Sequence, residues 1–366
     1  MATLQATVAP APMKKKRSIQ MRERGMPTLS DVAALAGVSK VSASVALNGA
    51  KSGTVLSEAT RGRIVMAAEE LGYKRNGSMA SATTGRFGCA ALLLSTHEHR
   101  SNLPQLTWNG IHDELAAHNM ALTMARLPDE KLTDEGVVPK ILREWMADGM
   151  LIDYTHLIPP RLIELLRAHH LPVVWLNSKQ DENCVYPDDF AAGQHAARRF
   201  LELGHRNLAY FDMSDATLRV EGQPHYSVFE RQDGWESVVR EAGLQPQIWT
   251  QDVPKKSRVA WLQSELKKSN RPSAVACYGI EDAQFLQMAA SKNGLELPRD
   301  VSLVTFGGAP EHSLGLDLAT FVIPHYELGL AATRMLLSRI ENPDLSLKPQ
   351  VLPFSWEKGA SLAPLR

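Results

Sequence analysis

One short stretch near the N-terminus constrains the fold of this chain more than any other. From Thr28 to Asn48 it runs T-L-S-D-V-A-A-L-A-G-V-S-K-V-S-A-S-V-A-L-N. Thr28 and Asp31 form a capping pattern, because a side-chain oxygen accepts hydrogen bonds from the free amides of a first helical turn. The pattern predicts a helix over 29–36, ended by Gly37, which provides the backbone freedom of a sharp turn. Ser39 is placed to cap a second helix.

The second helix is predicted to have one apolar side and one polar side. The predicted apolar residues are Val41, Val45 and Leu47, and the predicted polar residues are Lys40, Ser42 and Ser44. Two short helices joined by a Gly-containing turn are typical of a helix-turn-helix, whose second helix enters the DNA major groove. A plain helical hairpin inside a larger helical domain would share this pattern, and these residues alone leave it open.

A third helix is predicted between Ser57 and Tyr73. It begins at a serine cap and ends at Gly72. Its core-facing residues are predicted to be Ile64, Ala67, Ala68 and Leu71. Three helices would then close a small core over residues 27–73.

The motifs A-G-V-S, L-N-G, S-E-A-T-R and L-G-Y-x-x-N follow one another in this region. In this order they resemble the DNA-binding headpiece of the lactose-repressor (LacI/GalR) family. The resemblance implies that Lys40, Val41 and Val45 contact bases, that Thr28, Ser39, Ser44 and Asn48 contact phosphates, and that Ser42 lies on the same DNA-facing surface. Phosphate contacts position such a protein, whereas base contacts specify the site.

Residues 74–86 are rich in small side chains and correspond to the hinge of that family. Family hinge helices pair on the operator and wedge apolar side chains into the minor groove. Asn76 matches the family pattern, but Ala82 stands where a wedging leucine is usual. Met79 is a candidate substitute wedge, or a packing contact between paired helices. The resemblance therefore implies DNA binding with a weaker or displaced kink.

The zero net charge conceals a strong asymmetry. Residues 1–86 hold 13 Lys and Arg against 5 Asp and Glu, whereas the remainder holds 27 against 35. A basic segment associates with DNA through counterion release. Residues 1–26 are predicted to be a disordered basic tail, and its run from Lys14 to Arg17 fits a DNA-contacting arm as well as a plain solvated tail.

The composition predicts a cytoplasmic protein of at least two domains. A length of 366 residues exceeds what one core usually serves, and no apolar run is long enough to span a membrane. We find no signal-peptide pattern. Cys89, Cys184 and Cys277 lie far apart in or beside apolar runs, so they are predicted to be core residues without disulfide or zinc.

Residues 87–366 alternate between strand-like and helix-like segments, which predicts an α/β fold with parallel sheets. The predicted strands are 89–94, 149–152, 172–176, 208–211, 274–278 and 301–306. The predicted helices are 106–118, 188–203, 228–242, 281–293 and 326–340. Ligands of such sheets bind at the carboxyl ends of the strands.

Four further motifs resemble the effector domain of the same family. They are D-D-F-A-A-G (188–193), L-G-H-R-N-L-A (203–209), R-Q-D-G-W (231–235) and P-R-D-V-S-L-V-T-F (298–306). The resemblance implies two doubly wound lobes like those of periplasmic sugar-binding proteins, crossed three times and closing on a small molecule. It also implies dimerisation through the lobes, including residues 106–115.

By the same resemblance, Arg231 holds the effector and Ser95 and Asn177 are cleft positions. The alternative for Arg231 is a surface arginine at the start of a helix. The family's usual polar clamp is missing, because Gly279-Ile280 and Gly307-Gly308 replace it. Either the ligand is bulkier or less polar than a free sugar, or no ligand binds, or the clamp is supplied by other polar side chains, for which the candidates are Glu281, Asp282, Glu311 and His312.

The sequence contains little that indicates an enzyme. The pairs His97 and His99, and His169 and His170, have no third ligand at metal-binding spacing, and no dinucleotide or Walker motif occurs. We expect no catalytic residue, metal or cofactor. The sequence predicts a bacterial transcriptional regulator, more specifically a repressor, that binds a pseudo-palindromic operator as a homodimer and responds to a sugar-like effector. A solute-binding protein is the rival interpretation.

Overall fold

The computed structural model describes residues 27–48, 55–73, 86–97, 100–127, 147–155, 157–168, 171–213, 225–250 and 253–365. The chain divides into two compact units, residues 1–85 and 86–366. The predicted tail 1–26, and the predicted DNA contacts Asn76 and Met79, lie outside the described residues. No single helix in the described ranges is long and apolar enough to cross a membrane, and only the bent pair formed by Leu29–Ala36 and Lys40–Leu47 meets the length and composition test when counted together.

The first unit contains the three predicted helices, α1 (Leu29–Ala36), α2 (Lys40–Asn48) and α3 (Glu58–Leu71). The Thr28 hydroxyl accepts from the Asp31 amide, and the Asp31 carboxylate accepts from the Thr28 amide at 2.8 Å, so the predicted capping box is present. Gly37 and Gly72 end α1 and α3 in the left-handed region, at φ 65° and 63°. The core consists of Val32, Ala33, Ala36, Ala43, Ile64, Ala67 and Ala68.

One detail of the second helix was predicted wrongly. Val41 was assigned to the apolar side, but its side chain is 58% exposed, and Ala43 is the fully buried residue of α2. The helical period explains the difference, because residues three and four apart share a face. Ala43 therefore lies with Ala46 and Leu47 toward the core, and Val41 lies on another side.

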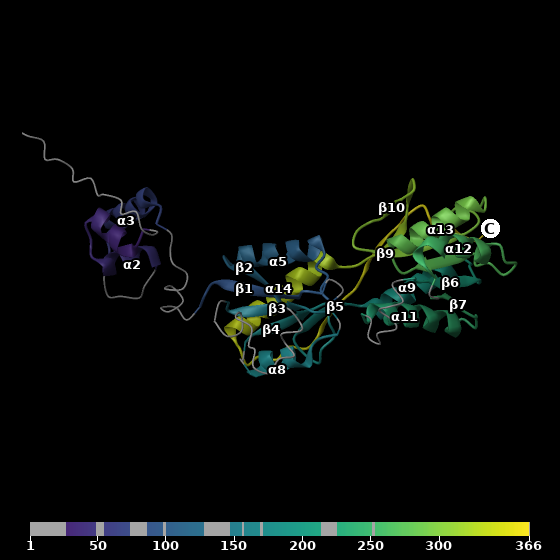
Figure 1. Ribbon diagram of the computed structural model, residues 1–366, viewed down its shortest axis with the longest axis horizontal. Helices are drawn as coiled ribbons and strands as arrows, with labels where there is room; N and C mark the ends of the chain where they lie inside the picture. Colours follow the sequence, from purple (N-terminus) through teal and green to yellow (C-terminus); the bar gives the residue numbers. More distant parts are fainter. Residues whose placement is uncertain are drawn as a thin grey trace, which may run out of the picture. The chain divides into compact units, whose positions relative to one another are not determined.

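The second unit consists of two lobes, each built on a six-stranded sheet with helices on both faces (Figure 1). In the first lobe the strand order is β13-β5-β4-β3-β1-β2, and all pairs are parallel. The strands are β1 (Cys89–Ser95), β2 (Ala121–Leu127), β3 (Gly149–Asp153), β4 (Val173–Leu176), β5 (Cys184–Pro187) and β13 (Gln350–Leu352). Helix α8 (Pro160–Ala168) covers one face, and α5 (Gln105–Ala117) and α14 (His325–Glu341) cover the other.

The second lobe repeats this plan with the order β14-β12-β9-β8-β6-β7. Only β14 is antiparallel to its neighbour. The strands are β6 (Leu208–Phe211), β7 (Gln247–Trp249), β8 (Ala274–Cys277), β9 (Ser302–Gly307), β12 (Ala319–Val322) and β14 (Ser355–Glu357), and a small hairpin pairs β10 (His312–Ser313) with β11 (Leu316–Asp317). Helices α9 (Asp189–Glu202) and α11 (Ser227–Glu241) cover one face. The other face carries α12 (Arg258–Leu266), preceded by the 3-10 turn η1 (Lys255–Ser257), and α13 (Ile280–Lys292).

The chain passes between the lobes three times, from β5 to α9, from β12 to α14 and from β13 to β14. The predicted two-lobed architecture is therefore confirmed. Each predicted strand and helix is present within a few residues of its expected bounds. The three cysteines are free; Cys184 and Cys277 are buried, as predicted, whereas Cys89 at the start of β1 is partly exposed.

The helix pairs α9–α11 and α5–α14 approach unusually closely at glycines. A Cβ added to Gly193 would lie 2.1 Å from the Arg231 carbonyl oxygen, and one added to Gly234 would lie 2.0 Å from that of Phe190. Gly110 and Gly329 make the equivalent contact between α5 and α14. These positions exclude any side chain, and the first pair determines how Arg231 of α11 lies against α9.

Candidate functional site

The first candidate site is the exposed side of α2 in the first unit. The backbone turns by 105° between α1 and α2, within the range of helix-turn-helix motifs. Ser39 caps α2 through a 3.1 Å bond from the Ser42 amide, and Lys40 and Val41 are exposed in the first turn. This turn is where a recognition helix contacts base edges.

The remaining predicted DNA contacts differ in their exposure. Thr28 and Ser39 are exposed, and Ser42 and Ser44 are partly exposed. Val45 is only 9% exposed, so it presents little surface to a base in this structure. Asn48 ends α2. The contacts among the described residues do not test whether these side chains bind DNA, so the assignments stay predictions.

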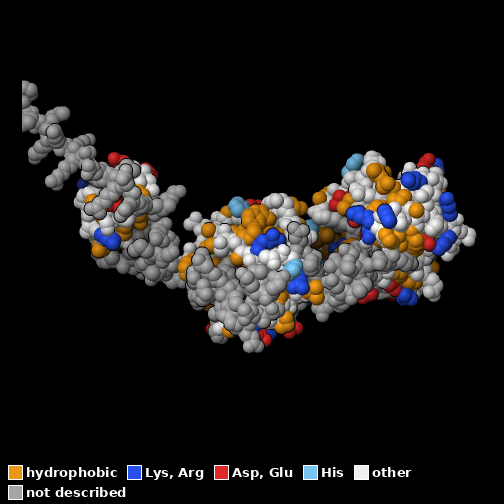
Figure 2. Space-filling view, in the orientation of Figure 1, with side chains coloured by type: hydrophobic (Ala, Val, Ile, Leu, Met, Phe, Trp, Pro, Cys, Tyr) orange, Lys and Arg blue, Asp and Glu red, His pale blue; other side chains and the backbone are white. Residues whose placement is uncertain are grey.

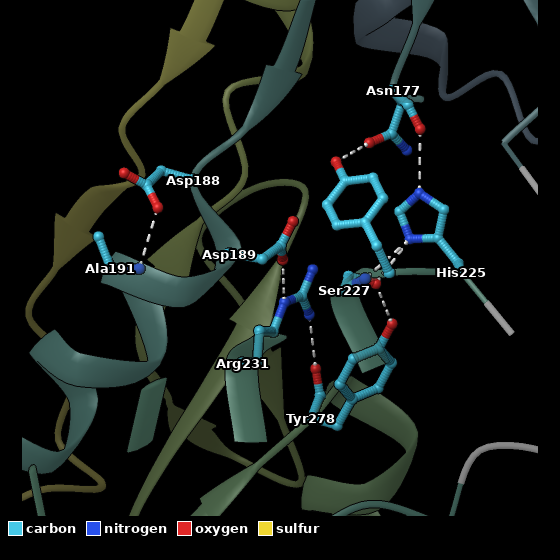
Figure 3. A network of polar contacts seen from close by, with 9 residues as sticks. Asn177, Asp188, Asp189, Ala191, His225, Ser227, Arg231 and Tyr278 are labelled. Atoms are coloured by element: carbon cyan, nitrogen blue, oxygen red, sulfur yellow. Dashed lines mark hydrogen bonds and ion pairs between the residues drawn. The ribbon is translucent and has the colours of Figure 1, made fainter. Parts of the chain in front are cut away.

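The second candidate site surrounds Arg231 in the second lobe. Arg231 is 6% exposed, so the alternative interpretation as a surface arginine is wrong. Its Nε donates to Asp189 Oδ1 at 2.5 Å, and its Nη1 donates to the Tyr278 carbonyl at 3.1 Å (Figure 3). Burial lowers the pKa of Arg231, but Asp189, Tyr278 and Tyr210 together raise it by more, so the pKa lies above its ordinary value and the guanidinium remains charged.

Three aromatic rings surround this guanidinium. Its central carbon lies 4.6 Å from the ring centre of Tyr278, 5.0 Å from that of Phe306 and 5.4 Å from that of Phe354. Cation–π contacts of this kind favour a charged group in a desolvated position. Nη2 donates to no other atom among the described residues, so its two N–H groups and the second N–H of Nη1 are the donors that Arg231 can offer a ligand.

A network of hydrogen bonds leads from this arginine to the other lobe (Figure 3). His225 Nε2 lies 3.0 Å from the Asn177 carbonyl oxygen, and its Nδ1 lies 2.7 Å from Ser227 Oγ. Ser227 Oγ in turn lies 2.7 Å from the Tyr278 hydroxyl, and the Tyr226 hydroxyl donates to Asn177 Oδ1. Asn177 follows β4 in the first lobe, whereas the other residues belong to the second. The network therefore connects the two lobes.

The protonation state of His225 determines which atom donates in each of these hydrogen bonds. Burial lowers the pKa of His225 to about 4, so its ring is neutral near pH 7. A carbonyl only accepts, so Nε2 carries the proton and Nδ1 accepts from Ser227. The Ser227 oxygen is then free to accept from Tyr278. Nearby, Lys179 of the first lobe pairs with Glu230 of α11 and lies over the rings of Tyr186 and Tyr226.

The structure brings only some of the predicted effector residues together. Arg231 and Asn177 belong to the connected network, and Ser95 is fully buried at the carboxyl end of β1. Glu281 is half exposed and pairs with Lys255 and Arg258. Asp282 is buried and accepts from the Met213 amide at 3.3 Å, and burial together with Asp212 raises its pKa to about 8.

Several residues of the site were not predicted. Asp189, His225 and Tyr278 surround Arg231, and of these only Asp189 belongs to a quoted motif, D-D-F-A-A-G (188–193). Asp153 ends β3 with a carboxyl group that is 1% exposed, and its Oδ2 has no partner among the described residues. Its position directly after an apolar strand is the feature of the sequence that could have identified Asp153 as a candidate site residue. Within the described ranges, no three His, Cys, Asp or Glu residues are placed to hold a metal, and His99, His169 and His170 lie outside those ranges.

These features define a class of protein: a capped helix-turn-helix unit together with a two-lobed domain of the periplasmic-binding type. Comparisons with known proteins agree. Residues 28–76 match the model of bacterial regulatory proteins of the lacI family, and residues 197–362 match that of the periplasmic binding protein-like domain. The chain belongs to the lacI family of DNA-binding transcriptional regulators.

Individual relatives support the same assignment over nearly the whole chain. The HTH-type transcriptional regulator GntR of Escherichia coli (strain K12) is 26% identical over 372 residues, covering 96% of this chain and 100% of the relative. Among solved structures, a lac repressor dimer bound to operator and the anti-inducer ONPF has a TM-score of 0.73 at 20% identity, covering 93% and 100%. A complex of the regulator CelR with cellobiose has a TM-score of 0.60 at 24% identity, covering 92% and 99%.

Proposed function

We propose that this regulator is a repressor that binds a pseudo-palindromic operator as a homodimer and is controlled by a small molecule between its lobes. The observation that carries the DNA-binding part is the capped helix α2, which exposes Lys40 and Val41 in its first turn. A solute-binding protein would not require this unit. Because its target is genomic DNA, we infer that the protein acts in the bacterial cytoplasm.

Selection from a pool of random duplexes tests this proposal. Binding is carried out at several salt concentrations, and the retained duplexes are sequenced. An inverted repeat, with affinity that falls steeply as salt rises, is the expected result, since two-fold protein symmetry calls for two-fold DNA symmetry. Retention of duplexes without a shared motif would contradict operator recognition.

A pair of variants tests whether α2 is the recognition helix. Lys40→Ala is expected to weaken operator binding and to relax the preference for one base position, because base contacts specify the site. Lys292→Ala, in α13 of the second unit, removes the same charge and serves as the control. Equal behaviour of the two variants would show that α2 is not the recognition helix.

A homodimer is proposed through the first lobe. Leu106 at the start of α5 is 40% exposed and Met124 of the edge strand β2 is 48% exposed. Figure 2 shows hydrophobic side chains gathered over this region, and such patches mark interaction surfaces. Leu106→Asp is expected to shift the protein from dimer toward monomer in sedimentation velocity. Phe229→Asp on α11, where Phe229 is 47% exposed, is the control.

The effector is proposed to bind at Arg231, whose Nη2 donates to no other atom among the described residues. The complex of CelR with cellobiose shows that a protein of this fold binds a carbohydrate, which supports a sugar-like effector here. The inter-lobe network gives the ligand a means of control, because a ligand that prefers one lobe arrangement shifts the population of that arrangement. Operator affinity measured with and without candidate ligands tests this coupling.

A further inference from the structure

One carboxylate holds the segment through which the chain enters the first lobe, directly after the predicted hinge. Asp148, immediately before β3, accepts hydrogen bonds from three successive backbone amides. The Phe87 amide donates to its Oδ1 at 2.7 Å, and the amides of Gly88 and Cys89 donate to its Oδ2 at 2.8 Å and 3.3 Å. Bonds to an ionised acceptor are stronger than neutral ones. We call Asp148 and these three amides the entry anchor.

Gly88 gives the backbone the shape that the entry anchor requires. Its φ is 65°, in the left-handed region that favours glycine. Successive amides around a left-handed residue point to one side and form a concave site for an anion. Here that anion is the Asp148 carboxylate. A Cβ at Gly88 would meet nothing within 4 Å, so the backbone conformation, and not a lack of space, favours glycine at this position.

The anchored segment is also joined to the strands on both sides of it. The Gly88 carbonyl accepts from the Ala121 amide of β2 at 2.9 Å, and the Cys89 carbonyl accepts from the Asp148 amide at 2.8 Å. Strand β1 lies between β2 and β3 (Figure 1), and its central residues are fully buried. The entry anchor is therefore attached to the packed centre of the first lobe, which deforms little.

The place of the entry anchor in the chain gives it a role beyond stability. Residues 74–86 are the predicted hinge, and the anchored amides follow directly after Arg86. A linker that is fixed at one end has fewer conformations to lose when the units that it joins bind a common target. Loosening of residues 87–89 would raise this entropic cost without changing any side chain that contacts DNA.

We propose that Asp148 is a positioning residue for operator binding, because it fixes the point at which the predicted hinge leaves the first lobe. The inference rests on the proposed binding of an operator by a homodimer. An operator sets the distance between two half-sites, whereas non-specific binding depends on phosphate charge and tolerates many arrangements of the two DNA-binding units. The entry anchor therefore strengthens operator binding and leaves non-specific binding almost unchanged.

The ratio of operator affinity to non-specific affinity separates this role from a purely structural one. The probes for the full-length protein are the duplex recovered from the random pool and a scrambled duplex of the same composition. Asp148→Ala is expected to bind the recovered duplex roughly tenfold or more weakly, and to change its affinity for the scrambled duplex by less than about twofold. Asp148→Asn keeps one acceptor oxygen, so its operator affinity is expected to lie between those of the parent and Asp148→Ala.

Asp300→Ala is the matched control for these measurements. Asp300 lies just before β9 in the second lobe, and its carboxylate accepts from the Glu296 amide at 2.8 Å. Binding is compared well below the melting temperature of each variant. An unchanged affinity ratio in Asp148→Ala, or an equal change in Asp300→Ala, would overturn the inference alone. A parent protein that binds both duplexes equally would overturn the proposed operator binding, and the inference with it.

A glycine variant tests the same arrangement from the backbone side. Alanine is strained at a φ of 65°, so Gly88→Ala is expected to release the amides from Asp148 and to weaken operator binding similarly. Both substitutions break the same bonds, so the double variant is expected to bind within about twofold of the weaker single variant. Gly294→Ala in the second lobe, with a φ of 71° and nothing within 4 Å, is the control. Additive losses from Asp148→Ala and Gly88→Ala would contradict the inference.

Amide hydrogen exchange measures the entry anchor without any DNA. The amides of Phe87, Gly88 and Cys89 are expected to exchange slowly in the parent protein, because each donates a hydrogen bond. In Asp148→Ala these three amides are expected to exchange at least about tenfold faster, while the central amides of β9 remain protected. Equal exchange rates in the parent and the variant would show that Asp148 does not hold this segment, and the inference would fail.

Discussion

At the scale of single residues, Arg231 depends on a partner far away in the chain, because it forms a buried ion pair with Asp189. Both side chains are nearly inaccessible, at 7% and 1%. Removal of one partner from a buried pair leaves an uncompensated charge in a poorly solvated place. Arg231 is therefore expected to support the second lobe as well as to contact a ligand.

Arg231→Ala is expected to lower the free energy of unfolding by about 3–5 kcal/mol, because it strands the Asp189 carboxylate. Adding Asp189→Asn removes that charge and is expected to recover part of the loss. Urea unfolding measures both effects. Arg240→Ala, which breaks an exposed pair with Glu236, is the control and is expected to cost at most about 1 kcal/mol. A similar small loss in Arg231→Ala would show that the pair contributes little.

Asp153 gives the site a predicted pH dependence. Burial raises the pKa of this carboxyl group to about 7 in the folded protein, well above its ordinary value near 3.8. The folded state therefore holds a proton that the unfolded state has lost, and stability falls as pH rises from about 4 to 7.

Asp153→Asn abolishes this titration. The variant is expected to be more stable than the parent at pH 8, by up to about 4 kcal/mol, with the gain shrinking as pH falls from 7 toward 4. Melting temperatures of both proteins across this range measure the difference, in which the buried histidines cancel. A gain that is constant with pH would mean that Asp153 is ionised normally in the folded protein.

At the scale of elements, two helix pairs depend on glycines at their crossings. The α9–α11 pair is the one that supports the effector site, since Gly193 lies against the Arg231 backbone. His225 and Tyr226, directly before α11, also carry the network to Asn177. Packing between α9 and α11 thus determines the position of Arg231 relative to the other lobe.

Gly193→Ala is expected to destabilise the second unit by at least about 2 kcal/mol, because the added methyl group meets a backbone oxygen at 2.1 Å. Gly62→Ala in α3 makes the same change in a helix where nothing lies within 4 Å. It is expected to stabilise by about 0.5–1 kcal/mol, since alanine favours helix more than glycine does. Chemical unfolding compares the two. A neutral Gly193→Ala would show that α9 and α11 can move apart.

At the scale of the whole molecule, positive charge is concentrated in one part of the chain but mostly outside the three helices. The described residues of the first unit hold Lys40, Arg61 and Arg63 against four acidic residues: Asp31, Glu58, Glu69 and Glu70. Most of the excess basic charge of residues 1–86 therefore belongs to the rest of that segment. Counterion release on DNA should depend strongly on those residues.

Replacement of Lys14, Lys15, Lys16 and Arg17 by glutamine is expected to flatten the salt dependence of operator binding. Because the proposed dimer carries two such runs, the slope of log affinity against log salt should decrease in magnitude by up to about 7, while the preferred sequence stays the same. Fluorescence anisotropy at several salt concentrations measures the slope. An unchanged slope would identify the tetrad as a solvated tail.

The sequence alone was sufficient to predict the headpiece helices, because the residues that begin and end each helix lie next to it in the chain. The capping pairs and terminal glycines act within a few residues, and they place α1, α2 and α3 correctly. The buried central strands were equally evident as apolar runs. Edge strands such as β2 were missed, because half of their side chains face solvent and the strand lacks a continuous apolar run.

What the sequence by itself determined is therefore the headpiece helices, the order of the buried central strands, the two-lobed class and the family. The tertiary structure decided which side chains meet. Asp189 reaches Arg231 across 42 positions, and His225 reaches Asn177 of the other lobe across 48 positions. Such contacts depend on packing between distant segments, and no local pattern of residues encodes them. For this reason the arginine was predicted but its partner, its enclosure and the neutral histidine beside it were not.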